Sequence, residues 1–323
     1  MGGMAAVGGR WVAAAAAVVG VVMVVTPSAS AVAPAGELLP DLRQAPVGCP
    51  GGYVGDPALC GDWDVCLVSE VENPNAACMS RGRARAVRLR FTTAEDNVGA
   101  GPLLLYGWRP GVDVPTMRVR QAFQSGVDGR IPDSFAAAQQ ATATSAYYEP
   151  AQAHQHWHLM GFEHFELRTP GGGVLVADRK NGFCLGDRYA TADAGVLPAV
   201  VRDDDTPQGR LGRVLAANTC NMHDPAALTV TQGISVGRGD DYRYTVDFQW
   251  LDITAVPSGT YDVVNTVNGD RTLRESDYGN NSSSIAISVR WPGGARSAPE
   301  VITRAPQVRL LRSCPGRDRC AGT

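Results

Sequence analysis

The chain has 323 residues, of which 29 are basic and 32 acidic, and its formal net charge is −3. A chain with this balance has no overall basic field of the kind that attracts nucleic acid. We therefore expect no nucleic-acid partner.

The first 31 residues predict a secretory signal. Arg10 precedes an apolar run from Trp11 to Val25, and Ala29-Ser30-Ala31 has the small-residue pattern of a cleavage site before Val32. A membrane anchor is the alternative, but about fifteen residues is short for a span and no second apolar run follows. The mature chain is then expected to be extracellular, with no membrane span. Its eight cysteines would face an oxidising compartment and form disulfides.

Three segments alternate apolar and polar residues as half-buried strands do: 87–91, 242–250 and 285–291. Pro257-Ser258-Gly259 predicts a turn between strands. Residues 133–143, rich in Ala and Gln, predict a short helix. The fold class is therefore mainly β, an antiparallel β-sandwich with long loops and few short helices.

We expect one domain over residues 32–291, with a disulfide-bearing N-terminal part over 32–85. Residues 292–323 contain six arginines and several prolines. They are expected to form a loosely held tail apart from a Cys314 to Cys320 loop.

Three of the five histidines fall within five residues, as His154-Gln155-His156-Trp157-His158. In a strand, side chains at i, i+2 and i+4 point to one face, so three imidazoles can converge on one copper or zinc ion. A flat strand would separate the outer two by roughly 13 Å, so a bend or bulge is required. The alternatives are a chance His-rich loop, or a structural zinc site closed by a distant ligand.

Of the 29 basic residues, 28 are arginine and only Lys180 is lysine. A GC-rich genome explains the arginines but not the position of the one lysine, in Asp178-Arg179-Lys180-Asn181-Gly182. Arginine cannot supply an uncharged amine nucleophile, whereas a buried lysine can.

A series of spaced motifs resembles, in order, the catalytic domain of lysyl oxidase. The motifs are His154-Gln155-His156-Trp157-His158, Phe162-Glu163-His164-Phe165-Glu166-Leu167, Lys180 with Phe183-Cys184-Leu185, Gly233-Ile234-Ser235, Tyr242, Gln249-Trp250-Leu251-Asp252-Ile253-Thr254 and Glu275-Ser276-Asp277-Tyr278-Gly279-Asn280-Asn281. Arg88-Leu89-Arg90-Phe91 and the pair Cys60 and Cys66 resemble the start of that domain. Several motifs in the correct order are more specific than any one of them.

The resemblance implies a copper-dependent amine oxidase. His154, His156 and His158 match the copper ligands, and Lys180 and Tyr242 match the pair that becomes lysine tyrosylquinone, the self-made cofactor. Tyr244 is a nearby competitor for the tyrosine. The implied reaction converts a primary amine or peptidyl lysine to an aldehyde with molecular oxygen, releasing hydrogen peroxide and ammonia.

His164 lies six residues beyond His158, and the ordinary pKa of a histidine suits proton abstraction near neutral pH, so His164 is a candidate general base. A histidine hydrogen-bonded in the core is the alternative. The family segment is one residue longer before His164. Asp247 and Asp277 are alternatives, the latter more typical of a turn. His223 is interpreted as a loop residue. The acidic runs 203–205 and 240–241 are interpreted as solvated loops, unless they rim the site and attract amines.

The resemblance also bears on the disulfides. Cys60 and Cys66 match a close family pair, and Cys49 with Cys78 and Cys314 with Cys320 follow by elimination. Animal members have cysteines where this chain has Ala153, Arg238 and Phe248. Cys184 and Cys220 thus lack their family partners, and we expect them to pair with each other.

Two other functions fit parts of the sequence. A secreted copper or zinc module without turnover would keep the histidines but would not need Lys180 and Tyr242. A structural sandwich domain that adheres to the cell surface would need none of them.

Overall fold

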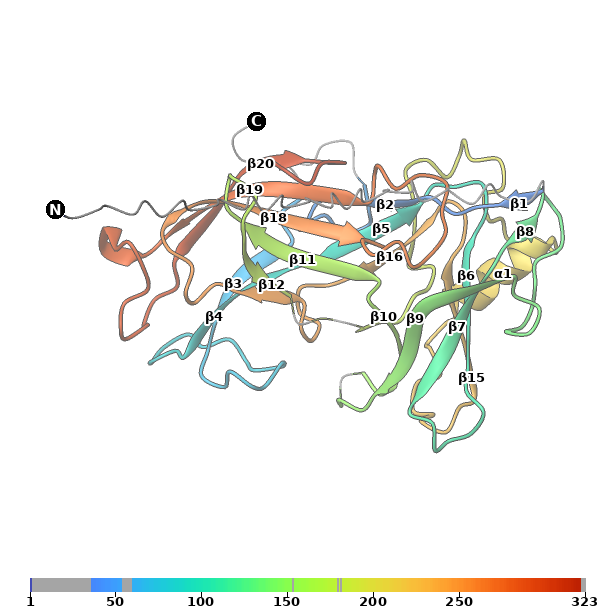
Figure 1. Cartoon of the computed structure of the whole chain (residues 1–323), viewed down its shortest axis with the longest axis horizontal. Helices are drawn as coiled ribbons and strands as arrows, with labels where there is room; N and C mark the ends of the chain where they lie inside the picture. The colour runs from blue at the N-terminus through green and yellow to red at the C-terminus, as the bar shows by residue number, and fades with distance from the viewer. Residues whose placement is uncertain (2–35, 54–59, 153, 179, 181, 321–323) are drawn as a thin grey trace. The chain divides into compact units, whose positions relative to one another are not determined.

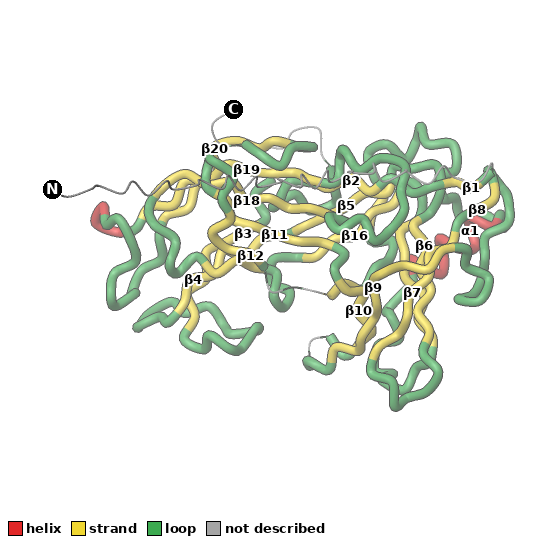
Figure 2. Tube along the Cα trace, viewed as in Figure 1, coloured by secondary structure: helices red, strands yellow, loops and turns green. Residues whose placement is uncertain are grey.

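The structure is a computed structural model that describes Met1 and residues 36–53, 60–152, 154–178, 180 and 182–320. The predicted signal, residues 1–31, lies outside the described residues apart from Met1. In the described part, antiparallel strands dominate and helix is confined to short segments (Figure 2). The predicted mainly β, antiparallel fold is confirmed.

Two sheets contain most of the strands, and Figure 1 labels all of their strands except β13. The six-stranded sheet has the order β13 (Gly182–Phe183), β10 (His156–Met160), β9 (Gln140–Glu149), β7 (Thr116–Ala122), β6 (Leu103–Trp108), β15 (Thr229–Ile234). The five-stranded sheet has the order β12 (Val174–Ala177), β11 (Glu163–Arg168), β18 (Gly259–Val267), β19 (Ser282–Arg290), β20 (Gln307–Cys314).

Three smaller sheets complete the strands of the described residues. They are the four-stranded β14 (Tyr189–Ala190), β16 (Arg238–Tyr242), β5 (Thr93–Asn97), β2 (Leu42–Gln44); the three-stranded β17 (Trp250–Asp252), β4 (Ala86–Phe91), β3 (Trp63–Val68); and the pair β1 (Glu37–Leu38) with β8 (Gln124–Ser125). Helix α1 spans Pro207–Ala216, and a 3-10 turn spans Pro292–Gly294.

The alternating apolar residues of β4 form part of the core between the three-stranded and the five-stranded sheets. Val87, Leu89 and Phe91 are each at most 3% exposed. The Phe91 ring meets the Phe165 ring of β11 edge to face, with centroids 5.3 Å apart. The three-stranded sheet therefore packs against the five-stranded sheet through the side chains that the period-2 pattern turns inward. The predicted strand over 285–291 lies in β19, and residues 257–258 lie between β17 and β18.

The predicted strand over 242–250 is wrong in its middle part. β16 ends at Tyr242, which pairs with Thr93, the first residue of β5. Beyond that point the Thr92 hydroxyl accepts the Tyr244 amide at 3.0 Å. The chain turns through residues 243–249, with Phe248 in the left-handed region at φ 59°. This reversal returns Asp247 toward the histidines.

The predicted helix over 133–143 is also wrong. Ser134 accepts two backbone bonds of a single turn, and Gln140 already begins β9. Pairing of β9 with β7 and β10 overrides the helix propensity of the alanines. Helix α1 forms instead directly after the acidic run 203–205 in the sequence. The Thr206 side chain caps the Gly209 amide there, and Pro207 occupies the first turn.

The C-terminal tail is better ordered than predicted. Residues 307–314 form β20 and pair along the edge of β19, so the sheet continues into the Arg-rich segment. Ile302 also bridges to Ala84. The expectation of a loosely held tail is therefore wrong for these residues.

Four disulfides connect the eight cysteines. Cys184–Cys220 and Cys314–Cys320 are as predicted. The predicted Cys60–Cys66 and Cys49–Cys78 pairs are wrong, because the structure joins Cys49 to Cys60 and Cys66 to Cys78. Cys66 lies inside the extended strand β3, at roughly 3.3 Å per residue, which carries it too far from Cys60 for a bridge.

Candidate active site

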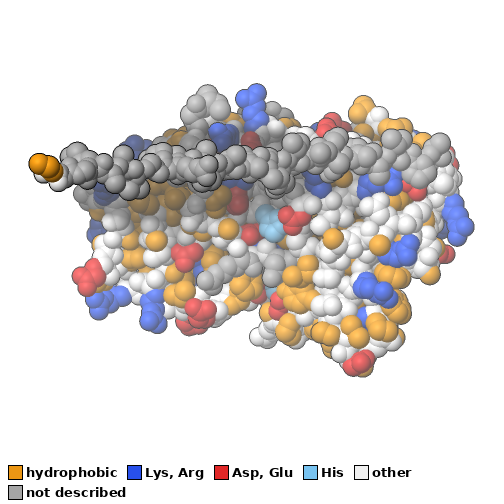
Figure 3. All heavy atoms as spheres, in the orientation of Figure 1, with side chains coloured by type: hydrophobic (Ala, Val, Ile, Leu, Met, Phe, Trp, Pro, Cys, Tyr) orange, Lys and Arg blue, Asp and Glu red, His pale blue; other side chains and the backbone are white. Residues whose placement is uncertain are grey.

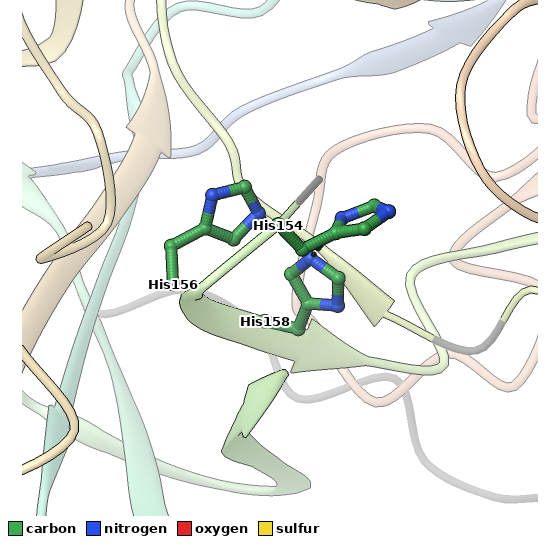
Figure 4. Close-up of side chains that lie close together, drawn as sticks. All are labelled: His154, His156 and His158. Carbon is green, nitrogen blue, oxygen red and sulfur yellow. Dashed lines mark hydrogen bonds between the residues drawn. The ribbon is translucent and has the colours of Figure 1, made fainter. Parts of the chain in front are cut away.

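The three clustered histidines converge because the chain bends between them. His156 and His158 belong to β10, whereas His154 lies in the preceding turn. Gln155 makes the bend with φ 48°, in the left-handed region. Figure 4 shows the three rings turned toward one another. The Nε2 atom of His158 lies 3.2 Å from His154 Nδ1 and 2.8 Å from His156 Nε2. The bend that the sequence required is present.

Backbone and side-chain bonds fix this turn. Ala151 O accepts both the His154 and the Gln155 amides, at 2.8 and 3.1 Å. Gln155 O accepts the His223 amide at 2.7 Å and the Tyr148 hydroxyl at 2.8 Å. His223 thus supports the site through its backbone, and its imidazole is not among the converging rings.

The triad meets the requirements of a nitrogen-ligated metal. One ligand atom from each ring lies within 4.8 Å of the others. Metal–nitrogen bonds of about 2.0–2.1 Å need ligand atoms roughly 3 Å apart, close to the observed spacing. Burial lowers the pKa of His156 to about 4 and that of His158 to about 2, so both rings are neutral at pH 7, as ligation requires. Three imidazoles suit copper or zinc.

A carboxylate supports the first histidine from behind. Asp247 Oδ2 lies 3.3 Å from His154 Nε2, on the side of the ring away from His158. Asn75 Nδ2 donates to the same oxygen at 2.6 Å. A carboxylate on the outer ring nitrogen fixes the tautomer and orientation of a metal-binding histidine. Asn75 itself lies in the loop closed by the Cys66–Cys78 disulfide.

We expect Asp247→Asn to lower copper affinity about 10- to 100-fold, because the amide cannot replace the carboxylate as acceptor for both His154 and Asn75. Competition with a chelator of known affinity measures the change. Asp241→Asn is the matched control, since Asp241 also faces the site but does not contact a histidine, and its affinity should stay within threefold. Equal affinities for the two variants would contradict the supporting role.

Lys180 and Tyr242 lie together beside the triad. The Lys180 Nζ atom is 4.9 Å from the centroid of the Tyr242 ring and 4.9 Å from that of Phe183. Phe183 packs edge-on against Tyr242, with centroids 5.0 Å apart. The Tyr242 hydroxyl donates to Asp240 Oδ2 at 3.0 Å. The ring is therefore held on one side by Phe183 and at its hydroxyl by Asp240.

The environment favours an uncharged lysine. Lys180 is only 4% exposed, and this burial lowers its pKa to about 8 although Glu163 and other carboxylates act in the opposite direction. Glu163 is itself buried, and burial raises its pKa to about 7. Burial likewise raises the pKa of Asp240 to about 8, so Asp240 can exchange a proton near neutral pH.

Two cavities open onto these groups. One of about 370 Å³ is lined by all three histidines together with Lys180, Asp240 and Tyr242. The other, of about 210 Å³, shares two histidines and Lys180 and adds Glu149 and Asp247. In Figure 3, pale blue histidine atoms are visible beside red carboxylate atoms near the centre of the face shown. The three histidine rings, the Lys180 amine and the Tyr242 ring therefore line one cavity, large enough for a small substrate.

The remaining sequence candidates lie outside this space. His164 is on β11 between inward-facing Glu163 and Phe165, and its side chain is 39% exposed with Nδ1 3.8 Å from Asp178 Oδ1. The Asp178 contact raises the pKa of His164. Tyr244 packs instead under the Arg90 guanidinium, 5.3 Å from its ring centroid. Asp277 caps a turn by accepting the Gly279 amide at 2.7 Å.

Sequence reasoning missed three residues of the site. Asp240 was interpreted as solvated, but it is 1% exposed and bonded to Tyr242; its place two residues before that tyrosine in a strand, on the same face, was the available signal. Gly182 lies under His158, where a Cβ would come within 2.5 Å of Nδ1. Asn75 has no local signal, because its partner is 172 positions away.

Comparisons with known proteins agree with this geometry. The lysyl oxidase family model matches residues 215–292. Lysyl oxidase homolog 4 of Mus musculus is 32% identical over 131 residues, which cover 40% of this chain and 14% of the relative. Lysyl oxidase homolog 1 of Homo sapiens is 34% identical over 153 residues, covering 47% of this chain and 22% of the relative. Over the matched part, residues 215–292, the chain therefore resembles the lysyl oxidase family.

The match to the family model includes Tyr242 and Asp247 but begins after the cluster His154, His156 and His158 and after Lys180. The aligned part spans less than a quarter of the length of the two relatives. The chain also departs from the animal pattern at its cysteines. Cys184 bonds to Cys220, and Cys220 O accepts the Trp157 amide at 2.9 Å, between the two histidines of β10. The altered disulfide therefore anchors the candidate metal strand.

Proposed function

We propose that this chain is a copper-dependent amine oxidase of the lysyl oxidase family. It would convert a primary amine, oxygen and water to an aldehyde, ammonia and hydrogen peroxide. Its cofactor would be lysine tyrosylquinone, formed from Lys180 and Tyr242. The observation that carries the proposal is the position of the only lysine, 4.9 Å from the Tyr242 ring and beside three converging histidines.

The chain's own groups have distinct tasks in this proposal. Bound copper would supply the redox chemistry with oxygen by which the Tyr242 ring is oxidised. Asp240 accepts the hydroxyl proton, and Phe183 packs against the Tyr242 ring, over which the Lys180 amine lies. The uncharged amine of Lys180 attacks the oxidised ring, because burial has lowered its pKa to about 8.

Proton removal from the substrate falls to a carboxylate in the same space. Asp240 and Asp247 both border the cavities that contain Lys180. His164 is less suited, because it pairs with Asp178 on the other face of β11. A base must come within hydrogen-bond reach of the proton that it removes.

Cofactor formation should depend on pH through Lys180. Its neutral fraction falls about tenfold for each pH unit below about 8, so we expect the formation rate to fall about tenfold per unit between pH 8 and pH 6. A bound divalent cation would shift this profile to lower pH. The rate of cofactor formation is measured at each pH by adding copper and stopping samples at intervals, and the copper content is determined in the same samples. A flat rate with constant copper content from pH 4 to 8 would exclude Lys180 as the titrating nucleophile.

Copper-loaded, oxygen-exposed protein tests the function directly. We expect visible absorbance and stoichiometric reaction with phenylhydrazine, together with peroxide release from a primary amine. A metal-binding module without turnover would hold copper but react with no carbonyl reagent. A structural adhesion domain would do neither. Either result would overturn the oxidase proposal.

We also propose that the chain is secreted. Four disulfides among the described cysteines suit an oxidising compartment. The predicted signal that would direct export lies outside the described residues. In the part of the chain that the structure describes, no helix combines the length and apolar character needed to cross a bilayer. Peptidyl lysine and small primary amines both remain within the proposed substrate class.

A further inference from the structure

A third cavity, of about 340 Å³, lies next to the candidate active site and is rich in arginine. Small residues of α1 line part of it. The charged residues that line it are four arginines and two aspartates: Arg188, Arg202, Arg213, Arg238, Asp187 and Asp203. Their formal charges leave two positive charges in excess. We call this space the arginine cavity.

Among the described residues, two of its four guanidinium groups make ion pairs or hydrogen bonds and two make neither. Arg213 pairs with Asp203 and Asp205, at 3.3 and 3.2 Å. Arg188 donates to Asn218 O at 3.0 Å. Within the described residues, the side chains of Arg202 and Arg238 make no ion pair or hydrogen bond. A guanidinium without a partner offers a planar fork that matches the two oxygens of a carboxylate.

The lining also contains a buried carboxylate, that of Asp187, with one oxygen that has no hydrogen-bond partner among the described residues. Asp187 is 9% exposed, and its Oδ1 accepts the Ser235 amide at 2.8 Å. Its Oδ2 is buried and has no partner in the described part of the chain. Arg188 and Arg238 both act on this carboxylate electrostatically. Asp187 therefore lowers the net positive charge of the cavity without neutralising all of it.

Arg188 joins the arginine cavity to the candidate active site. It lines both this cavity and the one that contains Lys180 and Tyr242. Its Nε atom lies 3.4 Å from Asp240 Oδ1, while the other oxygen of Asp240 accepts the Tyr242 hydroxyl. The arginine cavity therefore adjoins the active-site cavity at Arg188, whose guanidinium a ligand in either cavity can reach.

The two regions have opposite charge. The cavities around Lys180 contain the carboxylates of Glu149, Asp240, Asp241 and Asp247 against the cations of Lys180 and Arg188. By formal charge two negative charges remain there, and one remains when Asp240, with its pKa of about 8, is protonated; a divalent metal would offset them. The arginine cavity would keep its positive charge when the metal binds. After metal binding, the arginine cavity would therefore still attract an anionic group.

We propose that the arginine cavity binds a carboxylate of the amine substrate, so that preferred substrates carry a carboxylate near the reacting amine. A lysine peptide with a neighbouring acidic residue or a nearby C-terminus has this chemistry, as does a small amino acid amine. The inference rests on the proposed oxidase function and names the substrate class of the same site.

Binding is tested first, without turnover. Glutarate, a dicarboxylate without an amine, is titrated calorimetrically into copper-loaded protein. We expect Arg238→Gln to weaken glutarate binding roughly tenfold or more, because a charge-assisted pair is lost. Arg290→Gln, at an exposed position outside the cavity, is the control and should bind as the wild type does. Inorganic phosphate is titrated in parallel, and phosphate binding tighter than glutarate would overturn the carboxylate assignment.

Turnover is tested with two peptides that each contain one lysine and differ only by Glu or Gln beside it. The wild type should have a KM several-fold lower for the Glu peptide at similar kcat, and Arg238→Gln should erase that difference. Equal KM values in the wild type would overturn the inference. Glutarate binding that depends on Arg238, without oxidation of any amine, would overturn the oxidase proposal and with it the substrate assignment, leaving an anion site.

Discussion

Replacing Lys180 with arginine is expected to reduce amine oxidation to background while the protein still folds and binds copper. Arginine keeps the positive charge but is never deprotonated, so it cannot attack the Tyr242 ring. The visible absorbance and the phenylhydrazine reaction should disappear with the activity. In the wild type, peptide mapping should find a crosslinked peptide containing Lys180 and Tyr242, with a mass that reflects ring oxidation and no free lysine.

The tyrosine assignment has its own control. Tyr242→Phe should behave as Lys180→Arg does, because both remove one partner of the crosslink. Tyr244→Phe should retain the cofactor, since Tyr244 packs against Arg90 instead. Normal turnover by Lys180→Arg would contradict the quinone assignment and leave copper binding as the function to explain.

Replacing His154, His156 and His158 together with alanine is expected to lower the copper content from about one per chain to none and to abolish cofactor formation. Without these three imidazoles the site keeps no histidine nitrogen, and its carboxylates bind copper more weakly than imidazoles do. Metal analysis after dialysis measures the content, and circular dichroism checks that the β fold survives.

His223→Asn is the matched control for the triad. Its backbone has φ 63°, which asparagine tolerates, and its amide still bonds to Gln155 O. Copper content and cofactor formation should therefore be unchanged. Stoichiometric copper in the triple alanine variant would place the metal site elsewhere.

The sequence predicts the chemical groups of the site better than their supports. The spacing of His154, His156 and His158 indicates one face and a required bend, which Gln155 provides. The pairing of Lys180 with Tyr242 follows from the family resemblance alone, because 62 positions separate them and no local pattern connects them. Asn75 and Arg188 reach the site through long-range contacts, which periodicity does not encode.

The errors in the fold have a common physical cause. Alternation over 242–250 predicts a strand, but β5 offers no partner beyond Thr93, so the chain turns. Alanines in 133–143 favour helix, but β7 and β10 supply the edges between which β9 pairs. In both places the availability of a neighbouring strand decides the outcome, and neither composition nor period contains that information.

For the proposed oxidase, the Cys66–Cys78 bridge implies an expected order of maturation. Arg88 binds the carbonyls of Val71, Asn73 and Pro74 inside the closed loop. That loop delivers Asn75 to Asp247. Thiol oxidation should therefore come before copper loading, and copper loading before crosslinking. A compartment that keeps these two thiols reduced would hold the chain in a dormant form, and export to an oxidising space would start its activation.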